Sequence, residues 1–154
     1  MLDFVAYGTP APKGSKRFVG LSKAGRGILI ESCKAARPWG QSIKAAALTA
    51  RGSLAPIDGP VWVTLVFTLR KPVSAPKRRR TYPCRKPDLD KLCRQALDSL
   101  VEAGVLTDDA RVITLTASKV FVGEGLGTLD IPGVHIMVGA ADEDDQMLQY
   151  MLER

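Results

Sequence analysis

Two aspartates, Asp88 and Asp90, stand at the start of a segment whose apolar residues have the spacing of an amphipathic helix. A second acidic pair, Asp108 and Asp109, follows that segment after a short link. Clustered carboxylates supply the oxygen ligands that Mg²⁺ or Mn²⁺ prefers. Such a metal lowers the pKa of a bound water and stabilises the leaving oxygen of a phosphodiester. These residues therefore indicate a metal-dependent enzyme that acts on phosphodiesters.

The length of the helix decides whether Asp109 can reach the first pair. A helix from Asp90 to Ala103 is ~20 Å long. Five extended steps from Gly104 to Asp109 reach back ~17 Å. The link is just long enough, so we expect Asp88, Asp90 and Asp109 to assemble within one chain. A tight turn would allow the cluster only across a dimer interface.

Two cations accompany the aspartates. Arg94 lies four residues after Asp90, on the same helix face, where it can orient that carboxylate or contact a phosphate. Lys119, on the next predicted strand, is a candidate to neutralise charge on the phosphate in the transition state. Taken singly, these residues have ordinary structural uses, such as a helix cap for Asp88 or a turn for the second acidic pair. Their combination within a basic field favours the active-site interpretation.

The composition of the chain restricts which metal sites, which partners and which cellular location we expect. The chain has 154 residues, a net charge of +6, one histidine (His135) and three cysteines without a C-x-x-C spacing, so neither a zinc site nor a disulfide framework is expected. Ten of the 22 basic residues fall between Arg70 and Arg94, which favours a polyanionic partner. No apolar run has the length of a membrane span and the N-terminus does not resemble a signal peptide, so we expect a cytoplasmic protein that contacts no membrane.

Hydrophobic periodicity predicts the elements that position these residues. The strongest signal is the helix that Asp88 caps and Gly104 ends. We further expect strands over 2–7, 61–69, 111–122 and 133–138, a helix within 30–51, an acidic C-terminal helix over 141–154, and basic loops over 8–28 and 70–86. Together they predict an α+β fold, with a small mixed sheet covered by helices, as a single domain over residues 1–154.

The segments from Lys86 to Leu100 and from Gly104 to Val112 resemble the RusA family of Holliday junction resolvases. The family pattern is a PDxDN-L-x-K helix, a short link, DD-x-x-V and a lysine on the following strand, which Lys119 matches. The N-terminal Gly-Thr-Pro-Ala-Pro-Lys segment, residues 8–13, is similar to the family's G-x-P-x-P-K. The resemblance covers most of the chain.

This resemblance implies a homodimeric, Mg²⁺-dependent endodeoxyribonuclease, with Mn²⁺ as a substitute and no small-molecule cofactor. It would bind four-way DNA junctions and resolve them by paired symmetric nicks, in recombination and repair in a bacterium or a phage-infected host cell. Asp88, Asp90 and Asp109 match the family's catalytic and metal-binding acids. Arg94 replaces the usual lysine and Lys91 the usual asparagine. Arginine keeps the charge but does not readily give up a proton, so we expect Arg94 to contact phosphate.

We expect ten cations to bind DNA: Lys13, Lys16, Arg17, Lys77, Arg78, Arg79, Arg80, Arg85, Lys86 and Lys91. Two other functions stay open. A DNA-binding protein without catalysis would explain the cations, because phosphate contacts supply most non-specific affinity, but it leaves the carboxylates unexplained. A phage nuclease for other branched or packaging-related DNA fits the same residues as a junction resolvase.

Overall fold

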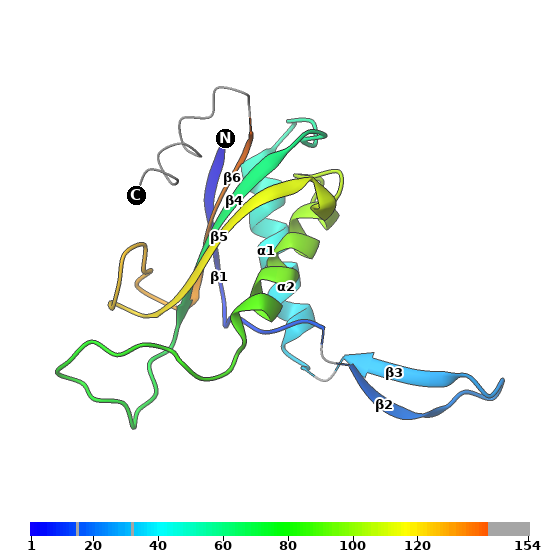
Figure 1. Cartoon of the computed structure of the whole chain (residues 1–154), viewed down its shortest axis with the longest axis horizontal. Helices are drawn as coiled ribbons and strands as arrows, with labels where there is room; N and C mark the ends of the chain where they lie inside the picture. Colours follow the sequence, from blue (N-terminus) through cyan, green and yellow to red (C-terminus); the bar gives the residue numbers. More distant parts are fainter. Residues whose placement is uncertain (15, 32, 142–154) are drawn as a thin grey trace.

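The computed structural model describes residues 1–14, 16–31 and 33–141, and its central element is a four-stranded mixed sheet (Figure 1). Its strands are β1 (Leu2–Tyr7), β4 (Val61–Leu69), β5 (Val112–Phe121) and β6 (Gly133–Ala140), in the order β1-β6-β4-β5. β6 runs antiparallel to both of its neighbours, whereas β4 and β5 are parallel. The strands predicted from the sequence are confirmed.

Two helices, α1 (Ala36–Arg51) and α2 (Leu89–Glu102), cover one face of this sheet (Figure 1). Their apolar stripes and the inward residues of the strands form one core, because each element must bury its apolar face against another. The fully buried residues of that core include Ile43, Ala47, Val63, Leu65, Phe67, Leu92, Ala96, Leu100, Val134 and Ile136. The α+β fold that the sequence predicts is confirmed.

The two helices approach each other closely at Gly40. A Cβ atom on this residue would lie 2.4 Å from Nε2 of Gln95, which is itself buried.

The helix predicted within 30–51 begins only at Ala36. Pro38 therefore lies in the first turn, where its missing N–H costs no helical hydrogen bond.

Most of the basic loop predicted over 8–28 is instead the first part of a β-hairpin. Strand β2 (Lys16–Leu21) pairs antiparallel with β3 (Gly27–Glu31), and the amide of Gly25 donates to the Ser22 carbonyl in the turn between them. Glycines and cations conceal the strand pattern, because the apolar residues stand in the runs 18–19 and 28–30 and do not alternate with polar ones. Six large apolar side chains on the hairpin are 40–67% exposed: Phe18, Val19, Leu21, Ile28, Leu29 and Ile30. In Figure 1 the hairpin projects away from the sheet and the helices.

The second predicted basic loop, 70–86, is confirmed, because no helix or strand lies between β4 and α2. The predicted acidic helix over 141–154 lies, apart from Ala141, outside the described residues. Among the helices that the structure describes, none has the length and apolar character needed to cross a membrane.

Candidate active site at the start of helix α2

Asp88 and Asp90 lie together at the start of α2, as predicted. Asp88 occupies the N-cap position with extended backbone angles (φ −70°, ψ 135°), yet its carboxylate accepts no capping hydrogen bond. It faces Lys91 instead, whose Nζ lies 3.4 Å from a carboxylate oxygen. Asp90 follows in the first turn with an exposed side chain. The positive end of the helix dipole favours both carboxylates here, and the Asp88 side chain is not used as a cap.

Cys93 is a core residue behind this pair. Its side chain is buried on the apolar face of α2. Burial raises the pKa of the Cys93 thiol, and the nearby charge of Asp90 raises that pKa further. The thiol is therefore protonated at neutral pH and poorly suited to act as a metal ligand or nucleophile.

Lys119 reaches the same end of the helix from strand β5. Its Nζ donates hydrogen bonds to the carbonyl oxygens of Arg85 (2.7 Å) and Pro87 (2.8 Å). These carbonyls belong to the residues that lead into Asp88. The lysine thus holds the end of the basic loop against the sheet and places an ammonium group at the residue before Asp88.

Arg94 and Lys13 connect the N-terminal segment to the exposed face of α2. The amide of Lys13 donates to the carbonyl of Lys91 (3.2 Å), and its Nζ forms an ion pair with Asp98 (2.8 Å). The Arg94 guanidinium lies so close to Gly14 that a Cβ there would be 2.9 Å from Nη1. Arg94 is exposed and stands one turn beyond Asp90, in a position to contact a phosphate.

Asp109 lies near the other end of α2. It begins the 3₁₀ turn Asp109–Arg111, and Asp108 caps this turn by accepting a hydrogen bond from the amide of Ala110 at 2.7 Å. Both aspartates line a cavity of about 320 Å³ together with Asp98 and Glu102. Glu102 is twelve residues after Asp90, which corresponds to ~18 Å along the helix.

The prediction that the three aspartates assemble within one chain is therefore wrong. Within residues 1–14, 16–31 and 33–141, no group of three or more Asp, Glu, His or Cys side chains is arranged to hold a metal ion. The reason is the path of the link. Gly104 (φ +69°) ends α2, after which the amide of Ile57 donates to the Val105 carbonyl (2.9 Å) and that of Thr107 to the Ile57 carbonyl (3.2 Å). These bonds hold the link at the end of α2, so it does not extend back along the helix.

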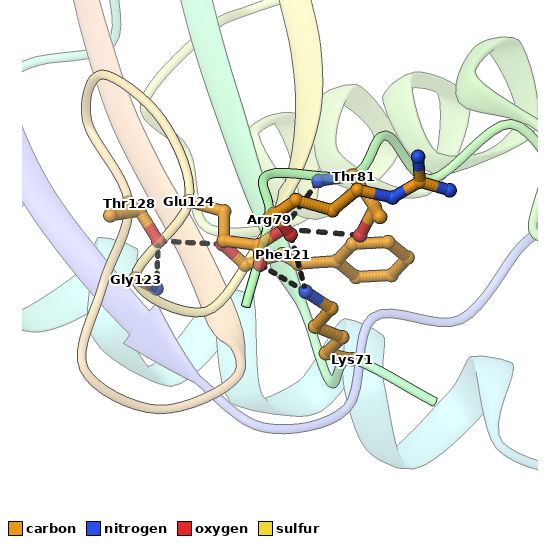
Figure 2. A network of polar contacts seen from close by, with 7 residues as sticks. All are labelled: Lys71, Arg79, Thr81, Phe121, Gly123, Glu124 and Thr128. Carbon is orange, nitrogen blue, oxygen red and sulfur yellow. Dashed lines mark hydrogen bonds and ion pairs between the residues drawn. The ribbon is translucent and has the colours of Figure 1, made fainter. Parts of the chain in front are cut away.

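A polar cluster around Glu124, which the sequence did not indicate, holds the base of the 70–86 loop. Figure 2 shows the Glu124 carboxylate accepting hydrogen bonds from the Lys71 ammonium and from Thr81, whose amide lies at 3.0 Å and whose hydroxyl lies at 3.2 Å. Lys71 also donates to the carbonyl of Arg79 (3.2 Å). The hydrogen bond from Lys71 is the main cause that lowers the pKa of Glu124, followed by that from the Thr81 amide. Glu124 thus connects the turn after β5 to Lys71, 53 positions earlier, and to Thr81, 43 positions earlier, and so holds the loop at two points.

The ten predicted DNA-binding cations form three groups. Lys16 and Arg17 lie on β2, the run Lys77–Arg80 lies in the 70–86 loop, and the remaining four surround the start of α2: Lys13, Arg85, Lys86 and Lys91. All are exposed except Lys13 and Lys91, which are partly buried. In the view of Figure 1, the hairpin and the loop extend to either side of the start of α2. The aspartate pair thus stands between positively charged segments.

A cavity of about 500 Å³ lies on the side of the chain that leads into Asp88. It lies between the 70–86 loop and the segment Thr9–Pro10, and its lining ends at Pro87, the residue before Asp88. Its walls are mainly apolar, with Arg70, Arg85 and Lys86 also contributing. Nothing in the sequence pattern indicated this cavity, because the fold brings its walls together from four separate segments.

A family model described as "Endodeoxyribonuclease RusA" matches residues 8–138, which include the aspartate pair, Asp109 and Lys119. No curated protein matches the sequence.

Proposed function

The chain belongs to the RusA family of endodeoxyribonucleases, and from this premise we propose that it resolves four-way DNA junctions by paired symmetric nicks. The observation that carries the proposal is the position of Asp88 and Asp90. Both stand at the positive end of α2, beside the Lys119 ammonium and between basic segments that can hold the phosphate backbone. A protein that only bound DNA would have no use for carboxylates at this place.

We propose Mg²⁺ as the cofactor, with Mn²⁺ as a substitute. Asp88 and Asp90 fit this ion, because proteins commonly bind Mg²⁺ through one or two carboxylates together with water and substrate phosphates. When bound, the ion would activate the attacking water and stabilise the leaving oxygen. Lys119 would hold the entrance of the site and place its charge near the reacting phosphate, and Arg94 would contact the DNA backbone one turn further along α2.

We propose a homodimer in which Asp109 completes the site of the partner subunit. Two sites related by a two-fold axis suit the cutting of opposite strands at symmetric positions. Asp109 lies apart from Asp90 within one chain. The three acids that match the family pattern would therefore come together between two subunits. The exposed apolar side chains of the β2–β3 hairpin provide surface for such a contact, since exposed apolar patches commonly mark interaction sites.

A second candidate keeps the same chemistry but acts on other branched or packaging-related DNA. The same acids and the same basic segments would serve both activities, so the choice of substrate must be measured. In either case we place the reaction in the cytoplasm of a bacterium or a phage-infected cell.

In the decisive experiment, the protein is incubated with labelled DNA substrates: a four-way junction, a flap, a fork and a linear duplex. Each incubation is done once with Mg²⁺ and once with EDTA. We expect paired, symmetric nicks in the four-way junction with Mg²⁺ and none with EDTA. The variant Asp90→Asn, purified in parallel, controls for contaminating nucleases. Equal cleavage of all the substrates, or cleavage of flap or fork alone, would contradict a junction resolvase.

A further inference from the structure

We propose that the 500 Å³ cavity beside Asp88 receives a nucleobase that is displaced from the stack of the DNA substrate next to the cut phosphate. The inference rests on the proposed function, because it takes branched DNA as the substrate. It adds a base-binding site to that function, and with it a means of selecting which phosphate is cut.

The floor and the rim of the cavity have the chemistry of a base-binding site. Leu69 and Phe121, paired neighbours at the ends of β4 and β5, form apolar walls and are each 8% exposed. Tyr82 lines the cavity with a largely exposed ring, over which the Arg80 guanidinium lies at 4.9 Å. Aromatic rings stack on bases regardless of sequence, and ligand cavities are commonly about 300–1,000 Å³ and mostly apolar. A single base fits this volume and these walls.

The cavity is also held open in advance. Five prolines with fixed φ angles line it: Pro10, Pro72, Pro76, Pro83 and Pro87. Thr81 in its wall is fixed by Glu124, and the Arg85 and Pro87 carbonyls are fixed by Lys119. Little conformational entropy would be lost when a ligand enters a wall that is already ordered.

Charge and position identify a nucleotide as the occupant. Arg70, Arg85 and Lys86 line the cavity and can hold the phosphates on either side of an inserted base. Pro87 ends the lining and Asp88 follows it directly, so the phosphate of the inserted nucleotide would lie near the aspartate pair. An apolar peptide would suit the prolines but would gain nothing from three cations.

The test uses a variant that fills the cavity and a matched variant that does not. Ala75 lines the cavity and is partly buried, so Ala75→Phe should fill it. Val73, two residues away in the same loop, is 91% exposed and lies outside the lining, so Val73→Phe adds the same ring to the surface. Both changes are made in the Asp90→Asn background, and folding is checked by thermal melting. Ser74→Trp, at an exposed lining position, replaces Ala75→Phe if the latter does not fold.

Four-way junctions carry the fluorescent base 2-aminopurine at single positions around the branch point. We expect a several-fold rise in fluorescence at one position next to the cut phosphate, because the base leaves the stack. The rise should disappear with Ala75→Phe and persist with Val73→Phe. In the otherwise native enzyme, Ala75→Phe should also flatten the dependence of the cleavage rate on the base at that position.

A uniform response at all positions, or an equal rise with Ala75→Phe, would overturn the base-binding site. Loss of the rise with both variants would also overturn it, because the cavity would then not be the cause. The proposed function has a separate readout, since cleavage of four-way junctions by the native enzyme stands or fails regardless of the fluorescence.

Discussion

The ammonium group of Lys119 lies 2.8 Å from the carbonyl oxygen of Pro87, the residue that leads directly into Asp88. This bond joins strand β5 to the start of α2 across 32 positions of the chain. Together with the bond to Arg85, it uses two of the three N–H donors of the ammonium. The same cation therefore fixes the backbone that leads into the site and brings a positive charge to the residue before Asp88.

Replacement of Lys119 by Met should lower junction cleavage by about 10²–10³-fold, the usual effect of losing one donor that stabilises transition-state charge. Met keeps an unbranched stem but cannot donate to the two carbonyls. Junction affinity should change only a few-fold, because the phosphate-binding segments are untouched. Single-turnover cleavage and a gel-shift titration measure the two effects; an equal loss of binding and cleavage would argue against a role in the chemical step.

The variants Asp90→Asn and Asp109→Asn should each abolish cleavage and leave junction binding intact or stronger. If Asp109 acts in the partner's site, mixing and re-equilibrating the two inactive variants creates heterodimers. Each heterodimer contains one site in which all the acids are native. Activity should therefore return, as single nicks and not paired ones.

If all the acids of a site came from one chain, every site in the mixture would carry a substitution and the mixture would stay inactive. Asp130→Asn, an exposed acid in the loop after β5, is the matched control and should cleave normally. A nicking assay on the mixture, at several ratios of the two variants, distinguishes the two outcomes.

Replacement of Glu124 by Gln should loosen the 70–86 loop. Trypsin should then cut faster after Lys77 to Arg80, with the peptides identified by mass spectrometry. Junction binding should weaken even though a negative charge has been removed, because the cations lose their fixed position. Tighter binding with unchanged proteolysis would show that Glu124 acts only as a repelling charge.

The Glu124 cluster should also depend on pH. Hydrogen bonds from Lys71 and Thr81 hold the pKa of Glu124 below its ordinary value, so the ionised carboxylate stabilises the folded loop. Its contribution is complete above the unfolded pKa of about 4.3 and is lost as the pH falls through the lower folded pKa. Hydrogen exchange of the Thr81 amide, corrected for the intrinsic rate at each pH, should therefore show loss of protection only below about pH 4.3.

Neutralising Lys77, Arg78, Arg79 and Arg80 together, each by Gln, should weaken junction binding and flatten its dependence on salt. Each phosphate contact contributes about 0.9 to the slope of log K against log salt, so the slope should fall by up to about 4. Lys44→Gln, on α1 and outside the three groups of cations, serves as the control. An unchanged slope would place the DNA on another surface.

The local pattern of the sequence was enough for the strands of the main sheet and for α2. In β4 the apolar residues Val61, Val63, Leu65, Phe67 and Leu69 recur with a period of two and are all buried. The apolar residues of α2 follow one helix face, and both spacings are those of a face turned toward the core. The hairpin was missed because its strands are exposed, so no buried face imposes an alternation on them. Its glycines and cations therefore gave the composition of a loop.

The sequence by itself indicated the candidate residues of the site and determined the end of α2 at which Asp88 and Asp90 stand, because that position follows from neighbours along the chain. Only the tertiary structure decided where the distant partners lie. Pairing of the link with Ile57 keeps Asp109 at the far end of α2, and the fold brings Lys119 to Pro87 and Glu124 to Lys71. Such contacts depend on how strands and loops pack across many residues, and no spacing along the chain encodes that packing.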